Sequence, residues 1–248
     1  MINLSVNVNK VATLRNSRGG SVPSVTAAVE TCLLAGAHGI TVHPRQDERH
    51  IRAADVREIA AMLPGRLTTA GAQVEFNIEG DPRPDLVDLV LAVKPDQCTL
   101  VPVSPGEITS HAGWPADTAL GPLGAIITRM KGAGVRVSVF VDPEEAAVRW
   151  AARVGADRIE LYTEPFARAY AQGEAAGARS FASYTSAATT AHGLGLGINA
   201  GHDLDLENLR LFKTLPHLNE VSIGHALIGH ALWVGLDRSV RDYLAALL

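Results

Sequence analysis

The stretch ARVGADRIELYT, residues 152–163, shows the pattern from which the fold can be predicted. Its first residues have the composition of a helix end, Gly155 interrupts them, and a short β-prone run from Arg158 to Tyr162 follows. A glycine after a helical segment typically ends the helix, and a short apolar run beyond it is typical of a strand. The stretch therefore predicts a helix, a tight stop and a strand in succession.

The same order recurs along the chain. It is found at residues 33–43, 93–102, 130–142, 190–201 and 215–224, and residues 2–9 and 73–79 supply two further strands. Alternating strands and helices imply a parallel sheet, and eight units in 248 residues fit a closed barrel better than an open sheet. We therefore expect an α/β protein with one domain over residues 1–248, a (β/α)8 TIM barrel.

Two connections are longer than such a barrel requires. The segment PVSPGEITSHAGWPADTAL, residues 102–120, follows the fourth predicted strand and is rich in proline, glycine and serine. A loop of that length in a compact domain is usually a lid or a binding loop, so we expect it to close over bound ligand. Residues 164–180, after the sixth strand, have a partly helical pattern.

Composition excludes several classes of protein. The net charge of −4 and the lack of a basic run argue against nucleic acid as the main partner. Cys32 and Cys98 lack a CxxC spacing and lie in apolar surroundings, which favours buried thiols over a disulfide. The first residues do not resemble a signal peptide, and no apolar run reaches the ~18 residues of a membrane span. We expect a cytoplasmic protein.

Polar residues collect where the predicted strands end, which is the end at which TIM barrels place their active sites. On residues 74–79, Glu75, Asn77 and Glu79 alternate with apolar neighbours, so one face of that strand carries a polar row. The other strand ends and the turns after them contribute Asn7, Asn9, His43, Arg45, Asp142, Glu160, Thr163, Asn199, His202, Gly224 and His225.

These residue types suit proton transfer on an anionic substrate. Histidine and carboxylate exchange protons near neutral pH, and arginine binds phosphate through two hydrogen bonds. His43, Arg45, Arg49 and His50 lie within eight residues, and the segments GHDLDLENL (201–209) and IGHALIGHA (223–231) lie where many barrels build a phosphate site. We expect all of them to face one pocket.

Three other kinds of site are alternatives: a P-loop, a metal centre and a Schiff-base lysine. A P-loop would need lysine where His230 stands. Metal-dependent hydrolases on barrels place two histidines on the first strand, where this chain has Asn7, Asn9 and Lys10, although a His/Glu metal site elsewhere stays possible. Lys10 raises a Schiff-base mechanism, but a lysine in a polar turn is equally well a phosphate contact.

Seven segments together resemble the pyridoxine 5'-phosphate synthase family of the deoxyxylulose-dependent route to vitamin B6. They occur in the family's order at residues 6–20, 36–51, 77–80, 100–109, 155–163, 198–204 and 220–229. Each motif is weak by itself, and the ordered set covers nearly the whole chain.

The resemblance implies a reaction and a set of roles. The reaction is condensation of 3-amino-2-oxopropyl phosphate with 1-deoxy-D-xylulose 5-phosphate to pyridoxine 5'-phosphate, phosphate and water, without metal or organic cofactor. His43 and Glu79 correspond to the proton acceptors and His202 to the proton donor. The other matching positions imply substrate contacts: Asn7, Arg18, Asp203, Gly224 and His225 for the aminoketone, and Arg45, His50 and Thr109 for the deoxyxylulose phosphate. Asn9 and Lys10 also correspond to positions that contact substrate. The resemblance also implies extra helices and a homo-octamer.

The chain departs from the family's pattern at several positions. Asn9 and Lys10 stand where Asp and His are common, Asp203 and Glu164 replace glycines, and His230 replaces an arginine. A carboxylate beside a bound phosphate is unfavourable unless it points away. Another phosphosugar lyase or isomerase on the same barrel, or a non-catalytic binder of phosphate ligands, therefore remains an alternative.

Overall fold

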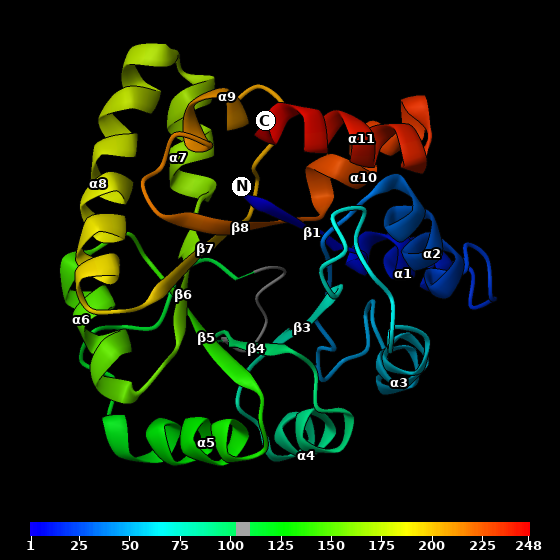
Figure 1. The fold of residues 1–248 in the computed structure, drawn as a ribbon, viewed down its shortest axis with the longest axis horizontal. Coiled ribbons are helices and arrows are strands. Elements are labelled where there is room, and N and C mark those ends of the chain that lie inside the picture. Colours follow the sequence, from blue (N-terminus) through cyan, green and yellow to red (C-terminus); the bar gives the residue numbers. More distant parts are fainter. Residues whose placement is uncertain (103–109) are drawn as a thin grey trace.

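Eight parallel strands form a closed barrel in the computed structural model, which describes residues 1–102 and 110–248 (Figure 1). The strands pair in chain order, and β8 closes on β1. Their bounds are β1 Asn3–Asn7, β2 Gly39–Val42, β3 Glu75–Gly80, β4 Gln97–Leu100, β5 Arg136–Val141, β6 Arg158–Tyr162, β7 Gly197–Gly201 and β8 Leu218–Ile223. The TIM barrel predicted from the repeated helix–stop–strand pattern is confirmed.

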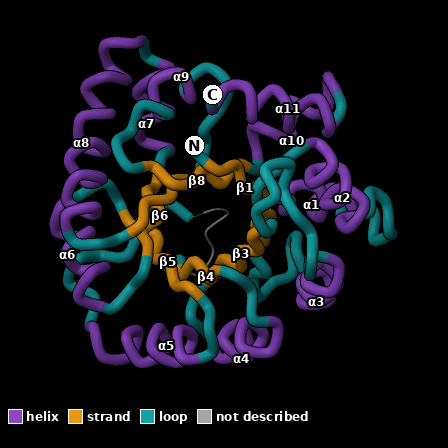
Figure 2. Tube along the Cα trace, viewed as in Figure 1, coloured by secondary structure: helices purple, strands orange, loops and turns teal. Residues whose placement is uncertain are grey.

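Helices surround the barrel on its outside (Figure 2). Their bounds are α1 Asn9–Asn16, α2 Val25–Ala35, α3 Ala53–Met62, α4 Pro84–Val93, α5 Leu120–Gly132, α6 Glu145–Val154, α7 Glu164–Ala171, α8 Glu174–Gly193, α9 Leu209–Phe212, α10 His225–Val234 and α11 Leu236–Leu247. Three strands are followed by two helices each, so α1, α7 and α10 are additional to the simple barrel. The long connection after β6 is helical, as its sequence indicates. Among the described helices, none is both long and apolar enough to cross a membrane.

Local sequence fixes where many of these helices begin and end. The Ser24 side chain caps α2 by accepting a hydrogen bond from the Ala27 N–H. Gly36 and Gly155 end α2 and α6 in the left-handed conformation, with φ of 106° and 91°. A side chain would strain this conformation, so glycine at these two positions marks the helix ends in the sequence.

The strand starts are held by a contact that repeats around the barrel. Near the start of each even-numbered strand, one polar side chain accepts a hydrogen bond from a backbone N–H of the preceding odd-numbered strand. The pairs are Leu4 N to His38 Nδ1, Phe76 N to Asp96 Oδ2, Val137 N to Asp157 Oδ2 and Ile198 N to Asn219 Oδ1, at 2.7–3.1 Å. Each contact satisfies a backbone donor at a strand start and fixes the register of two neighbouring strands.

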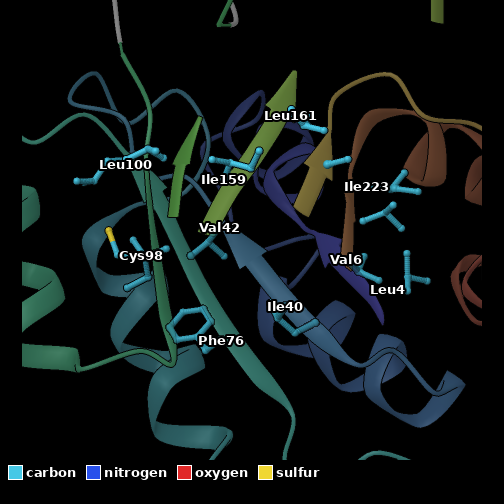
Figure 3. Close-up of a cluster of buried hydrophobic side chains, with 14 of the residues drawn as sticks. Leu4, Val6, Ile40, Val42, Phe76, Cys98, Leu100, Ile159, Leu161 and Ile223 are labelled. Atoms are coloured by element: carbon cyan, nitrogen blue, oxygen red, sulfur yellow. The ribbon is translucent and has the colours of Figure 1, made fainter. Parts of the chain in front are cut away.

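The apolar core lies between the barrel and the helices. Leu4, Val6, Ile40, Val42 and Leu100 belong to it, together with apolar residues of the surrounding helices (Figure 3). Both cysteines are buried there as free thiols, as predicted. Strand residues alternate between two faces, so the residues between these apolar positions point into the barrel.

The barrel interior is filled largely with polar side chains instead of the branched apolar layers usual in this fold. Ser5 bonds Thr41 at 2.7 Å, the Thr99 hydroxyl donates to Asn77 Oδ1 at 3.1 Å, and Asn199 Nδ2 donates to Glu220 Oε1 at 3.2 Å. Further contacts join Gln97 to Arg136, Arg136 to Glu75, and Arg158 to Asn199. Buried polar groups are costly unless they are hydrogen-bonded, and this network supplies partners for most of those in the barrel interior.

The long segment after β4 is described only in part. The predicted lid covers residues 102–120, and residues 103–109 lie outside the described part of the structure. Its second half is anchored: Trp114 Nε1 donates to the Leu100 carbonyl at 2.9 Å, and the Gly113 N–H donates to Asp142 Oδ2 at 3.2 Å. Gly113 packs so closely on the Val141 backbone that a Cβ atom would lie 2.3 Å from the Val141 Cα.

Candidate active site

Polar side chains from several strands meet around Glu79 at the carboxyl end of β3. Nδ1 of His43, just after β2, lies 4.0 Å from Oε2 of Glu79. Asn7, at the end of β1, donates a hydrogen bond from Nδ2 to the same oxygen at 3.4 Å. Ser222 on β8 is near enough to the carboxylate to lower its pKa. The structure thus places His43 beside Glu79, as their positions at two neighbouring strand ends predict.

Asn9 holds the backbone of His43. The His43 N–H donates to Asn9 Oδ1 at 2.9 Å, and the Asn9 N–H donates to Asn7 Oδ1 at 3.0 Å. Asn9 was predicted as a substrate contact, and in the structure its side-chain oxygen accepts a hydrogen bond from the protein. Two asparagines therefore link the end of β1 to the residue after β2.

Burial shifts the pKa values of His43 and Glu79 in the directions that favour the uncharged side chain. Loss of solvent lowers the pKa of His43 well below its ordinary value, and the nearby charges of His50, Arg45 and Arg83 lower it further. Burial raises the pKa of Glu79 to about 7. His43 is consequently neutral at neutral pH, and its buried Nε2 has no hydrogen-bond partner among the described residues. A neutral imidazole next to a carboxyl group of this pKa can accept and return protons.

A second buried carboxylate, Glu160 on β6, lies in the barrel interior near Glu79. Burial raises its pKa well above the ordinary value, and the charges of Glu79 and Glu220 raise it further. Its Oε2 makes no hydrogen bond within the part of the chain that the structure describes. Gly201 leaves room for this group, because a Cβ there would lie 2.4 Å from Glu160 Oε1. Glu160 was predicted from the sequence to lie among the polar residues at the strand ends, but without a role in catalysis or binding.

Arg45 and His50 form a second group beside His43. The His43 and His50 rings lie 6.0 Å apart between centroids, and Arg45 is buried. Burial lowers the pKa of His50 to about 4, and the charges of Arg45 and Lys10 add to this effect. The group therefore offers a guanidinium and a neutral imidazole, which is a combination suited to an anion.

The loop that carries His50 is fastened to α1 by a buried ion pair. Arg15 donates two hydrogen bonds to the carboxylate of Asp55, at 2.5 and 2.9 Å, and a third to the His50 carbonyl at 3.3 Å. Asn16 Nδ2 donates to the same carbonyl at 2.7 Å. Neither Arg15 nor Asp55 was predicted as part of the site, because nothing in their local sequence shows that α1 and α3 meet here.

Arg83 holds the other side of the same loop. Its guanidinium donates to the Pro44 carbonyl at 2.6 Å and pairs with Asp81 and Asp85. The side chain is 13% exposed, and its charge contributes to the lowered pKa of His43. Arg83 follows β3, so it ties the segment after β2 to the neighbouring strand.

The loops after β7 and β8 complete the ring of predicted residues. His202 and Asp203 follow β7, and Nδ1 of His202 lies 3.9 Å from Oδ2 of Asp203. The polar interaction with the nearby His202 lowers the pKa of Asp203, and the charges of His225 and Lys10 contribute. Gly224 precedes α10 and contacts Asn7, since a Cβ at Gly224 would lie 3.1 Å from the Asn7 Cβ. The N-terminus of α10 supplies backbone N–H groups of the kind that bind phosphate.

Two predicted residues, Lys10 and Arg18, are less directly connected to this cluster. Lys10 is exposed on the first turn of α1 rather than in a polar turn, because the helix already begins at Asn9. Its charge still acts on His50 and Asp203. Arg18 is exposed beyond the end of α1, and Thr109 lies outside the described residues. Within residues 1–102 and 110–248, no group of three His, Cys, Asp or Glu side chains could hold a metal ion.

Comparison with known proteins gives one consistent result for the sequence. The family model described as pyridoxal phosphate biosynthesis protein PdxJ matches residues 4–248. A protein of Bacteroides fragilis named pyridoxine 5'-phosphate synthase is 52% identical over 244 residues, which are 98% of each chain. A protein of the same name from Christiangramia forsetii is 50% identical over 248 residues, covering 100% of both chains.

Solved structures share the fold at much lower sequence identity. Tryptophan synthase from M. tuberculosis matches with a TM-score of 0.63 at 11% identity, over 99% of this chain and 93% of that one. Phosphoribosyl anthranilate isomerase from Thermotoga maritima matches with a TM-score of 0.59 at 13% identity, over 100% and 98%. At such low identities, the similarity shows only that these proteins share the barrel fold with this chain.

Proposed function

The chain belongs to the PdxJ family and is a pyridoxine 5'-phosphate synthase, and from that premise we propose which of its side chains carry out the reaction. The substrates are two phosphorylated compounds, 3-amino-2-oxopropyl phosphate and 1-deoxy-D-xylulose 5-phosphate, and the products are pyridoxine 5'-phosphate, phosphate and water. The observation that carries the assignment of residues is the contact of a neutral His43 with a Glu79 whose pKa is about 7.

Ring formation needs several proton transfers, and the site offers more than one group for them. The amine of one substrate attacks the ketone of the other, water leaves the resulting carbinolamine, and a carbon-bound proton is removed as phosphate departs. We assign the proton acceptor roles to His43 and Glu79 and the proton donor role to His202. Glu79 is the base best suited to neutral pH, because its pKa of about 7 gives comparable populations of both protonation states.

Two separate regions would bind the two phosphates. Arg45 and His50 form the buried basic group that suits the phosphate of the ketose. Gly224 and His225 at the start of α10, with the backbone near Asp203, suit the phosphate of the aminoketone. Asn7 and Arg18 would contact the remainder of the aminoketone, and Lys10 and Thr109 would contribute on the ketose side.

One assay tests the function directly. The purified protein is incubated with both substrates, and pyridoxine 5'-phosphate and free phosphate are measured together. Equal amounts of the two products are expected. Phosphate release or isomerisation of one substrate alone would instead indicate another phosphosugar lyase or isomerase, and binding without turnover would indicate a non-catalytic phosphate binder.

We also propose that the protein is a cytoplasmic homo-oligomer, with an octamer favoured. Large apolar side chains are exposed at the end of α10, where Leu232 is 72% and Trp233 87% exposed. A monomer rarely leaves such neighbouring side chains uncovered. Sedimentation is expected to give a mass several times 26.2 kDa, and Trp233→Glu is expected to lower it. A wild-type mass equal to one chain would overturn this proposal.

A further inference from the structure

His202 and the residue after it have an unusual backbone conformation. The φ angles of His202 and Asp203 are 81° and 58°, so two successive residues other than glycine lie in the left-handed region. This conformation is strained for a residue that carries a side chain, and it persists only where surrounding contacts enforce it. The backbone at His202 must therefore be held by its neighbours.

Thr163, at the end of β6, supplies the contact that holds it. Its side chain is completely buried. The Thr163 N–H donates to the Gly201 carbonyl at 3.0 Å, and the hydroxyl oxygen lies 2.6 Å from the same carbonyl and within bonding distance of the His202 carbonyl. A threonine hydroxyl has a single proton to donate. Because the Gly201 carbonyl already has the backbone donor, this proton is available to the His202 carbonyl.

A second contact fixes the other side of the turn, and aromatic rings fix the imidazole. Asn208 Nδ2 donates to the Asp203 carbonyl at 3.0 Å. The His202 ring packs on Phe140 and Tyr162, with centroid distances of 5.9 and 5.6 Å. With the backbone bonded on both sides and the ring packed, the direction of the imidazole depends on how the turn is held.

We propose that Thr163 is a positioning residue of the reaction: its hydroxyl holds the left-handed turn at His202 and so directs the imidazole toward the substrate. This inference rests on the proposed role of His202 as proton donor. A hydroxyl at this place acts on catalysis through the geometry of another residue and need not touch substrate. A displacement of about 1 Å in a catalytic group can reduce turnover by about 10²-fold.

The test compares two substitutions of nearly the same size. Thr163→Val keeps the branched shape and removes the hydroxyl, whereas Thr163→Ser keeps the hydroxyl and removes a methyl group. We expect Thr163→Val to lower kcat by about 10²-fold, with little change in KM for either phosphate substrate, and Thr163→Ser to recover most of that loss. Should the valine variant not fold, Thr163→Cys replaces it, since a thiol is a weak donor, and the same loss is expected.

Tyr184→Phe is the matched control. The Tyr184 hydroxyl is also buried and donates to the Tyr162 carbonyl at 2.7 Å, one residue before Thr163, but it does not hold the His202 turn. This variant is expected to lose stability comparable to that lost by Thr163→Val and to keep its turnover. Melting temperatures measured on both variants separate stability from catalysis.

The outcomes separate the positioning role of Thr163 from the proton donor role of His202 and from the proposed function. If Thr163→Val turns over normally while His202→Asn does not, the role of Thr163 is wrong and that of His202 stands. If Thr163→Ser is as slow as Thr163→Val, the hydroxyl is not the cause, and the proposal is overturned. If the wild-type protein makes no pyridoxine 5'-phosphate, the proposed function itself fails.

Discussion

Replacing Glu79 with glutamine is expected to make the protein more stable and much less active at the same time. Burial raises the pKa of Glu79 from 4.5 to about 7 in the folded protein. Below about pH 4.5 the carboxyl group is protonated in both the folded and the unfolded states, so it has no linked effect on stability. Between the two pKa values the unfolded state loses its proton first, and stability falls as the pH rises. Above about pH 7 the fold carries the full cost of a buried charge.

The size of that cost follows from the shift. One pKa unit corresponds to about 1.4 kcal/mol, so the shift to about 7 corresponds to up to about 3 kcal/mol. Glutamine keeps the size and hydrogen-bonding ability of the side chain without the charge. Glu79→Gln is therefore expected to raise the free energy of unfolding by as much as about 3 kcal/mol near pH 8.5 and to change it little near pH 4.5. Urea denaturation at the two pH values measures the difference.

Turnover is expected to move in the opposite direction. Loss of a general base typically costs ~10²- to 10⁴-fold, so kcat should fall at least ~10²-fold while both phosphates still bind. The wild-type kcat/KM should rise with pH around an apparent pKa near 7, and the variant should lack that rise. If Glu79 merely neutralised a buried cation, glutamine would cost stability and spare turnover, and that pair of results would refute the catalytic reasoning.

Glu220 provides the matched control at the other end of the barrel. It lies near the start of β8, and burial raises its pKa to about 7 as well, with Glu75 contributing. Glu220→Gln is expected to gain stability in the same pH range and to keep near-normal turnover. A loss of turnover as large as that of Glu79→Gln would mean that any buried charge in the barrel affects the chemistry.

Two further predictions concern the loop that carries Arg45 and His50. Arg45→Met should raise KM for the ketose phosphate at least about tenfold, with a much smaller effect on kcat. Arg49→Met, on the exposed part of the same loop, should have little effect on either constant. A large fall in kcat with unchanged KM would contradict a binding role for Arg45. Arg15→Met leaves Asp55 as a buried unpaired charge, so the free energy of unfolding measured by denaturation should fall by about 3–5 kcal/mol. Adding Asp55→Leu should recover part of this loss. A loss near zero would mean that the ion pair does not hold the His50 loop.

Local patterns in the amino-acid sequence were enough to predict the fold and most of the residues that meet at the strand ends. Helix stops such as Gly155, and the alternation of Glu75, Asn77 and Glu79 with apolar neighbours, are local signals. They depend only on the conformations open to a few adjacent residues, so they can be recognised without knowing what the chain packs against. Once eight parallel strands are predicted, their carboxyl ends must meet at one rim, and His43 must lie near Glu79.

How these side chains are held, and which protonation state they adopt, depends on contacts between distant parts of the chain. Arg15, Arg83 and Thr163 act on His50, Pro44 and His202, which are 35, 39 and 39 positions away in the chain. The pKa of Glu79 near 7 comes from the removal of water by the closed barrel. The left-handed turn at His202 is contacted by Thr163, which lies on another strand, and by Asn208 later in the same loop. Desolvation and strain are properties of the packed surroundings, and no short segment of the sequence carries them.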